Sequence, residues 1–268
     1  MTAQTAPALE FHDLTVAYPA NGHTKNGHAR QALSGITATI PFGAVTGIVG
    51  PNGAGKTTLL KAAAGLLGVA GRDIVLAGRA LDDWDRDVLA RTTAYLPQGG
   101  DASWPIAVRD LVALGRIPHG ATLHALGPED RVAVGRAMAR ADVDGFADRR
   151  VDRLSAGERS RVLFARALAT GADILLCDEP AAYLDPAHQL RLMALLAEEA
   201  ARGAAVVVTL HDLALAARCD HLLVLNGGRI AALGSAESAL SDKVLAEVFG
   251  ISAERAGESR VPVPWSLV

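Results

Sequence analysis

The order of apolar and polar residues along the chain predicts alternating strands and helices. Short apolar runs between turn residues are typical of strands, whereas apolar residues three or four positions apart are typical of helices. The runs predict strands at residues 9–17, 36–40, 44–49, 73–76, 93–96, 174–179, 206–210, 222–225 and 229–233. The helical spacing predicts helices at residues 59–64, 85–91, 158–171, 236–240 and 242–249. One more helix is predicted to begin at Pro186, with Asp185 as its cap.

The stretch from residue 108 to residue 150 interrupts this alternation. Its apolar residues keep the spacing of a helix, and Gly120, Gly127 and Pro128 separate the pieces. We therefore interpret it as an inserted helical subdomain in an α/β fold. Asn226-Gly227-Gly228 predicts a hairpin turn, and the residues after 251 show no periodicity that predicts an element.

Composition limits the class of protein. The chain has 268 residues, half of them hydrophobic, which suits one large domain or a domain with a subdomain. Its net charge of −3 gives no general attraction to nucleic acid. Two cysteines, Cys177 and Cys219, and a start without a leader pattern favour a reducing compartment. Since no apolar run approaches the roughly 20 residues of a membrane span, we expect a soluble protein that reaches a membrane only through a partner.

The strongest chemical signal is a glycine-rich loop between a predicted strand and a predicted helix. Its sequence fits G-x-x-x-x-G-K-S/T at every fixed position, and no internal repeat supplies a second one. Its residues are Gly50, Pro51, Asn52, Gly53, Ala54, Gly55, Lys56, Thr57 and Thr58. Backbone N–H groups at such a strand-to-helix turn point at one spot, where the helix dipole favours a phosphate. We expect Lys56 to reach the β- and γ-phosphates and Thr57 to hold Mg²⁺. The alternative is a turn that binds nothing.

The predicted strand at 174–179 ends in two carboxylates, Asp178 and Glu179. Asp178 ends an apolar run, where a buried carboxylate costs several kcal/mol unless it finds a cation or hydrogen bonds. Bound Mg²⁺ would supply that cation, and Glu179 would be placed to orient water against the γ-phosphate. The alternative is a solvated acidic turn closed by Pro180.

Ser155-Ala156-Gly157-Glu158 supports two interpretations. S-x-x-E is a capping box, in which Ser155 and Glu158 satisfy N–H groups at a helix start. The same helix start is also a second anion site, which would serve the nucleotide of a partner chain. Elsewhere, His23 and His28 lie in a predicted exposed loop at residues 19–31, where solvated histidines are a better interpretation than a metal site.

With these motifs in this order, the sequence resembles the ATP-binding subunits of ABC transporters from about Leu9 to Phe249. The loop at Gly50 is similar to Walker A, residues 154–158 to the signature, and residues 174–179 to Walker B with its glutamate. The resemblance implies a P-loop NTPase (RecA-like) core with an antiparallel β subdomain and an inserted α-helical subdomain in one ATPase domain. The core and β subdomain would comprise residues 1–98 and 153–250, the helical subdomain residues 99–152, and a tail residues 251–268.

The resemblance also implies roles for single residues. Tyr18 matches the aromatic residue that stacks on adenine, Gln98 the Q-loop glutamine, Asp185 the D-loop aspartate and His211 the switch histidine. Local alternatives are strand-end packing for Tyr18, a solvated amide for Gln98 and a helix cap for His211. The implied catalytic residues are Glu179, His211 and Gln98. The implied nucleotide contacts are Tyr18, all nine loop residues named above, Ser155, Gly157, Glu158 and Asp185. The implied Mg²⁺ ligands are Thr57, Gln98 and Asp178.

The same resemblance implies partners. Two copies would form a homodimer with two ATP molecules between them, each held by Walker A of one copy and the signature of the other. The dimer would bind integral membrane permease subunits at the cytoplasmic face of the inner membrane, and through them serve a substrate-binding protein. In the signature, Ala156 stands for the usual glycine and Glu158 for the usual glutamine. An alanine would be strained there if the position needs a positive φ.

The stretch after Gln98 is similar to importers of ferric siderophores, haem and cobalamin. It contains Gly115-Arg116-Ile117-Pro118-His119, which local physics alone interprets as a helix end. Similar resemblances follow the D-loop, at His188 and Gln189, and the switch histidine. A ferric siderophore is the expected cargo, with haem or cobalamin next. The alternatives are a soluble ABC-type ATPase with a regulatory or assembly role and, far behind, a P-loop kinase.

Overall fold

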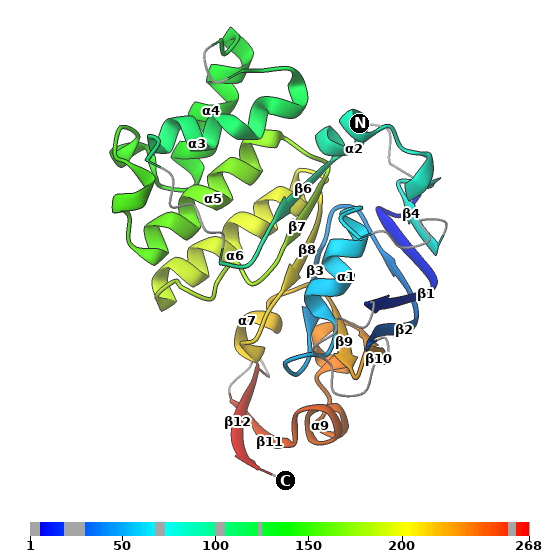
Figure 1. The fold of residues 1–268 in the computed structure, drawn as a ribbon. Helices are drawn as coiled ribbons and strands as arrows, with labels where there is room; N and C mark the ends of the chain where they lie inside the picture. Colours follow the sequence, from blue (N-terminus) through cyan, green and yellow to red (C-terminus); the bar gives the residue numbers. More distant parts are fainter. Residues whose placement is uncertain are drawn as a thin grey trace. The chain divides into compact units, whose positions relative to one another are not determined.

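A computed structural model describes residues 6–18, 30–67, 73–99, 105–122, 125–256 and 261–267. The chain forms two compact units (Figure 1), Met1–Asp83 with Val207–Val268, and Trp84–Val206. Each unit is described by itself below. The predicted loop at residues 19–31, with His23 and His28, lies outside the described residues except for its last two, which begin a strand.

The first unit contains an antiparallel sheet in the order β2-β1-β4-β5. Its strands are β1 (Leu9–Tyr18), β2 (Arg30–Ile40), β4 (Ile74–Leu76) and β5 (Arg79–Ala80). Leu9, Leu14 and Val16 of β1 are buried, with exposed residues between them, as expected of a strand with one face on a core. The predicted strand at 9–17 is confirmed, and β2 begins six residues before the predicted start.

The same unit holds the strand that leads into the glycine-rich loop. β3 (Val45–Val49) is buried along its whole length and pairs in parallel with β9 (His221–Asn226). β9 then pairs antiparallel with β10 (Arg229–Gly234) through the predicted hairpin, which is confirmed. After the loop comes α1 (Lys56–Ala63). β8 (Ala205–Thr209) crosses from one unit to the other.

The C-terminal part of the first unit is only partly predicted. It contains α7 (Leu213–Ala216), α8 (Ala236–Ala239), α9 (Asp242–Val244) and a π-helical turn η6 (Leu245–Phe249). Beyond them, β11 (Ile251–Ala256) pairs antiparallel with β12 (Val261–Leu267). The sequence assigns no element to that hairpin, because Pro262 and Pro264 interrupt the strand pattern of β12.

The second unit is built around one helix. α5 (Ala156–Thr170) contacts α3 (Val108–Ala113), η3 (Leu114–His119) and α4 (Pro128–Arg140). Figure 1 shows α3 and α4 beside α5. The inner face of α5 is buried and includes Val162, Phe164 and Ala165. The other elements are η2 (Leu81–Asp83) just before the unit, then α2 (Arg86–Thr92), β6 (Thr93–Leu96), η4 (Asp144–Phe146), η5 (Val151–Arg153), β7 (Ile174–Cys177) and α6 (Pro186–Ala201).

The predicted helical region at 108–150 is confirmed as separate pieces. Gly120 follows η3, Gly127 caps α4, and Pro128 is the first residue of α4. β6 and β7 pair in parallel, with Leu96 opposite Cys177, so both strands end at the same edge. Across the described ranges, none of the helices has the length and apolar character needed to cross a bilayer.

Candidate functional site

The glycine-rich loop joins the end of β3 to the start of α1. Gly55 stands at the cap position with φ of 105°, and a Cβ there would lie 2.8 Å from the Ala32 carbonyl oxygen. At Gly50, with φ of 152°, a Cβ would lie 2.2 Å from the Leu225 oxygen. Both positions therefore require glycine, and the cap residue offers no side chain of its own to the helix N–H groups. The loop has the shape expected of an anion cradle.

Lys56 is buried at the start of α1. Its Nζ donates to the carbonyl oxygens of Gly50 (2.8 Å) and Pro51 (3.3 Å), so the ammonium group lies inside the curve of the loop. A lysine at this place supplies a positive charge close to the backbone N–H groups. The arrangement suits phosphate groups, which are the ligands that the sequence predicts here.

Tyr18 lies close to the same helix. Its hydroxyl is 3.3 Å from Oγ1 of Thr58, and the side chain is 38% exposed. The phenol is therefore anchored beside the phosphate loop while much of the ring remains accessible. This placement is what stacking on a base requires.

His211 follows β8 in the first unit. The backbone N–H of Leu210 donates to Ile48 of β3 (3.1 Å), so β8 and β3 end at the same edge. His211 thus leaves the sheet where the phosphate loop begins. The alternative that His211 caps a helix is wrong, because α7 begins at Leu213 and Asp212 caps it by accepting from two backbone N–H groups.

In the second unit, the ends of β6 and β7 bring three predicted site residues together. Asp178 is only 1% exposed, its backbone N–H donates to Leu96 (2.8 Å), and its Oδ2 lies 3.5 Å from the Tyr95 hydroxyl. The side-chain amide of Gln98 donates to Oε2 of Glu179. Glu179 has φ of 48°, the left-handed region that residues other than glycine rarely occupy. Such backbone strain is often found at functional residues.

The predicted capping box at the start of α5 is confirmed. Glu158 N donates to Ser155 Oγ (3.2 Å), and Ser155 N donates to Glu158 Oε2 (2.8 Å). Ala156 is the first helical residue of α5, and its φ is not positive. The alanine at this position therefore causes no backbone strain. At the next position, Gly157, a Cβ would lie 3.3 Å from the Tyr183 oxygen, so a larger residue would be crowded there.

Asp185 caps α6, as predicted. It accepts from His188 N (2.9 Å), and its Oδ2 lies 2.7 Å from His188 Nδ1. The hydrogen bond from the His188 backbone N–H is the main reason why the pKa of Asp185 lies below its ordinary value. The contact with the His188 side chain lowers it further. Gln189 donates to the Ala181 oxygen (3.2 Å). The His-Gln pair therefore fixes the turn that precedes α6.

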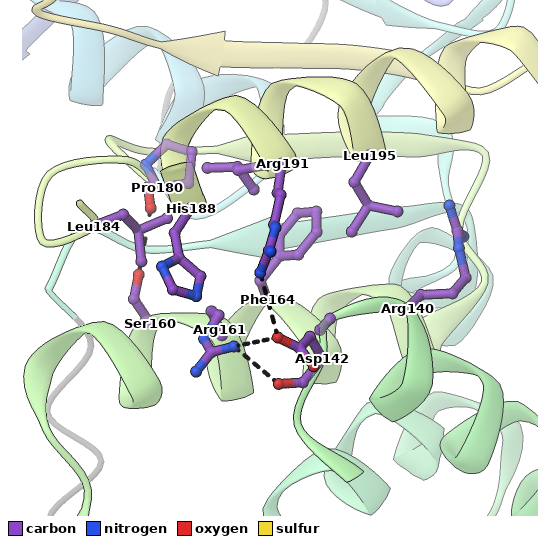
Figure 2. A pocket seen from close by; sticks show the side chains of 12 residues that line it. Arg140, Asp142, Ser160, Arg161, Phe164, Pro180, Leu184, His188, Arg191 and Leu195 are labelled. Carbon is purple, nitrogen blue, oxygen red and sulfur yellow. Dashed lines mark hydrogen bonds and ion pairs between the residues drawn. The ribbon is translucent and has the colours of Figure 1, made fainter. Parts of the chain in front are cut away.

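Two cavities flank the N-terminal half of α5, on either side of the hydrogen bond from Ser160 Oγ to the Pro180 oxygen. The larger, of about 210 Å³, contains Glu179, Gly99 and Ala156 in its wall. Figure 2 shows the smaller one, where Arg161 donates to the carbonyl and carboxylate of Asp142 and Arg191 approaches the same carboxylate. The carboxylate of Asp142 is therefore shared by two arginines in the wall of the smaller cavity.

Some contacts around α5 were not predicted from sequence. Arg116 Nη1 donates to the Ala169 and Thr170 oxygens (3.0 and 3.2 Å), and His119 Nε2 lies 2.8 Å from the latter. The residues that resemble an importer motif therefore cap the last turn of α5. At its first turn, Arg149 pairs with Glu158 (2.9 Å). These contacts join residues that lie far apart in the sequence or in different elements, so the sequence predicts them only once the helices are placed.

Known proteins are similar to this chain in sequence and in fold. The sequence pattern of the family described as ABC transporter matches residues 33–182. The hemin import ATP-binding protein HmuV of Streptomyces coelicolor is 45% identical over 221 residues, which are 82% of this chain and 78% of HmuV. The cobalamin import ATP-binding protein BtuD of Halobacterium salinarum is 42% identical over 82% of this chain and 55% of BtuD. The solved dimeric MJ0796, a bacterial ABC transporter cassette, is 26% identical with a TM-score of 0.74, covering 85% of this chain and 99% of that one.

The chain belongs to the ABC transporter family and carries its ATPase domain. It is an ABC-type ATPase that binds ATP. The predicted α/β P-loop NTPase fold is confirmed by these relatives. The roles of the individual site residues stay predictions, and the geometry above shows where each of them lies.

Proposed function

We propose that the chain is the ATP-binding subunit of an importer, which hydrolyses ATP to drive uptake of hemin or a related metal chelate through a separate membrane permease. The observation that carries the proposal is the 45% identity to a hemin import ATP-binding protein over 82% of the chain. Cobalamin and ferric siderophores are the alternative cargoes. The relatives named above favour hemin over the siderophore that the sequence alone suggested.

The nucleotide would lie in the cradle after β3. The backbone N–H groups of residues 50–58 and Lys56 Nζ would bind the phosphates, and Tyr18 would stack on the adenine. The predicted Mg²⁺ ligands offer oxygen donors of the kind that the ion prefers. They are the Thr57 hydroxyl in the first unit, and the Gln98 amide oxygen and the buried Asp178 carboxylate in the second. A bound ion would neutralise phosphate charge.

Hydrolysis would depend on Glu179 and His211. Glu179 is placed at the end of β7 to accept a proton from the attacking water, and His211 would donate a hydrogen bond toward the γ-phosphate. The Gln98 amide donates to Oε2 of Glu179, and the proposed base would accept the proton of water at its other carboxylate oxygen.

A second copy of the chain would complete the site. Ser155 and Gly157 at the amino end of α5 would approach the phosphates bound by the partner copy, with Asp185 nearby. The energy of nucleotide binding would close the dimer, and hydrolysis would reopen it. The dimeric cassette MJ0796 supports this arrangement for the family.

The permease would dock on the second unit, at the cytoplasmic face of the membrane. Ile117 of η3 is 54% exposed although its neighbours Arg116 and His119 are fixed on α5. Arg91 of α2 donates to the Pro118 oxygen (3.0 Å), and Val88 of the same helix is also exposed. An exposed apolar side chain on a rigidly held turn is suited to packing against a partner.

The test is ATP-driven uptake by vesicles that contain the chain together with the permease that co-purifies with it. Hemin, cobalamin and a ferric siderophore are offered separately, and Lys56→Ala serves as the ATP-binding control. Hemin uptake that requires ATP and is lost in Lys56→Ala would support the proposal. Uptake of another cargo would change the substrate. ATP hydrolysis without any co-purifying permease would favour a non-transport ABC-type ATPase instead.

A further inference from the structure

The signature segment carries a negative charge where an anion is expected to bind. Glu158 lies in the first turn of α5, three residues after the cap Ser155. The amino end of a helix attracts anions because its N–H groups and its dipole are positive there. A carboxylate at this place would repel an approaching phosphate unless its charge were neutralised.

Both oxygens of the Glu158 carboxylate are engaged. Oε2 accepts from the Ser155 N–H (2.8 Å), and Oε1 accepts from Arg149 Nη1 (2.9 Å). The Ser155 N–H, with smaller help from Arg149, holds the pKa of Glu158 below its ordinary value. The carboxylate is therefore ionised at neutral pH, and Arg149 supplies the compensating charge.

Arg149 is itself held in place. Its Nη2 donates to the Arg153 oxygen (3.3 Å), and its guanidinium lies 5.5 Å from the centre of the Phe146 ring. Arg161 lies 5.6 Å from the same ring, so the phenyl group contacts two cations. Because these contacts fix the guanidinium, less side-chain freedom is lost when Glu158 binds it than for an unrestrained surface pair.

We propose that Arg149 is a positioning residue for the ATP reaction, which neutralises Glu158 and keeps its carboxylate in the capping box. The amino end of α5 is then free to receive the phosphates of a nucleotide bound by a second copy of the chain. Arg149 acts through Glu158 and not by touching the nucleotide. The inference rests on the proposed role of residues 155–158 at the nucleotide.

The test is a double-mutant cycle on ATP hydrolysis. The unaltered chain, Arg149→Ala, Glu158→Gln and the double variant are compared for KM and kcat. Arg149→Ala should raise the KM for ATP about five-fold in the presence of Glu158, and less than about two-fold in the background that carries Glu158→Gln. The rise in KM that Arg149→Ala causes in the presence of Glu158 should be smaller at high salt, because the interaction between the two side chains is electrostatic.

Two controls separate this role from folding. Arg150→Ala removes the neighbouring arginine, which pairs with Asp152 (2.6 Å), and should leave the KM for ATP unchanged. Arg149→Lys keeps the charge and should restore part of the loss. If Arg149→Ala raised the KM equally in both backgrounds, or did not raise it at all, the inference would be overturned.

A further variant separates this inference from the proposed function. Ser155→Arg places a bulky side chain at the start of α5 and should impair ATP-dependent dimerisation. If Ser155→Arg left ATP-dependent dimerisation unchanged, the proposed role of the signature would be wrong, and the inference that rests on it would be wrong as well. If Ser155→Arg impaired dimerisation while Arg149→Ala left the KM unchanged, only the inference would fail.

Discussion

The side-chain amide of Gln98 donates a hydrogen bond to the carboxylate of Glu179. The two residues follow neighbouring parallel strands, β6 and β7, whose ends lie at the same edge. Glu179 also has φ of 48°, so its backbone is held in a conformation that costs free energy. The proposed catalytic role of Glu179 would place the base in this contact, at the edge where the two strands end.

We predict that Glu179→Gln abolishes turnover but permits ATP-dependent dimerisation. The amide cannot accept a proton from water, so kcat should fall by about 10²–10⁴-fold. Nucleotide contacts are retained, so size-exclusion chromatography should show the dimer with ATP. Normal turnover in this variant would remove Glu179 from the role of base.

A second prediction concerns Tyr18. Tyr18→Ala should raise the Kd for ATP by about 5–150-fold, because base stacking contributes roughly 1–3 kcal/mol. Tyr18→Phe is the matched control, since it loses the hydroxyl near Thr58 but keeps the ring. Titration with a fluorescent ATP analogue measures both. Equal losses in the two variants would mean that the hydroxyl contact, and not the ring, is what matters.

Gly50→Ala should destabilise the phosphate loop. A methyl group there would lie 2.2 Å from the Leu225 oxygen, and the φ of 152° disfavours alanine. The expected loss is about 2 kcal/mol or more in the free energy of unfolding, together with loss of ATP binding. Urea denaturation measures the first effect. Gly145→Ala, where a Cβ meets nothing within 4 Å, is the control, and a similar loss in it would argue against the steric cause.

Arg116→Ala should destabilise the second unit. Arg116 is only 13% exposed, pairs with Asp130 (2.9 Å) and caps the last turn of α5. Its removal takes the arginine hydrogen bond from the Ala169 oxygen and the cation from the Asp130 carboxylate, so we expect a fall in the melting temperature of about 4–8 °C. The control is Arg136→Ala on the exposed face of α4. Equal melting temperatures for both variants would show that the contacts of Arg116 contribute nothing.

The same ion pair predicts a dependence on pH. The hydrogen bond from Arg116 holds the pKa of Asp130 below its ordinary value. A carboxyl with a lower pKa in the folded chain stabilises it above the pKa of the unfolded chain, and this contribution is lost as the pH falls through the folded value. The stability difference between the unaltered chain and Asp130→Asn should therefore shrink below about pH 4. Urea denaturation from pH 7 to pH 3 measures it, and a constant difference would contradict the assignment.

The sequence predicts best where one short segment carries all the information. The loop at Gly50, the cap of α6 and the capping box at Ser155 depend on residues a few positions apart, and each has the predicted local geometry. The hairpin of β11 and β12 depends on pairing across a turn, and its prolines hide the pattern. Local propensity could not show it.

The contacts of Arg116 and Arg149 illustrate a different limit. Both residues stand in stretches that the sequence marks, but their partners lie 53 and nine positions away. A charged side chain in a loop can bind any of several helix ends, and only the packing of α3, α4 and α5 decides which. The departure of Glu158 from the family pattern is visible in the sequence, whereas its compensation by Arg149 is not.

Both extremities of α5 are clamped by side chains from earlier in the chain, Arg116 and His119 at one extremity and Arg149 at the other. A helix of 15 residues is about 22 Å long and resists bending. η3 and the signature segment are therefore joined through a single regular helix, which arginine contacts hold at both of its ends.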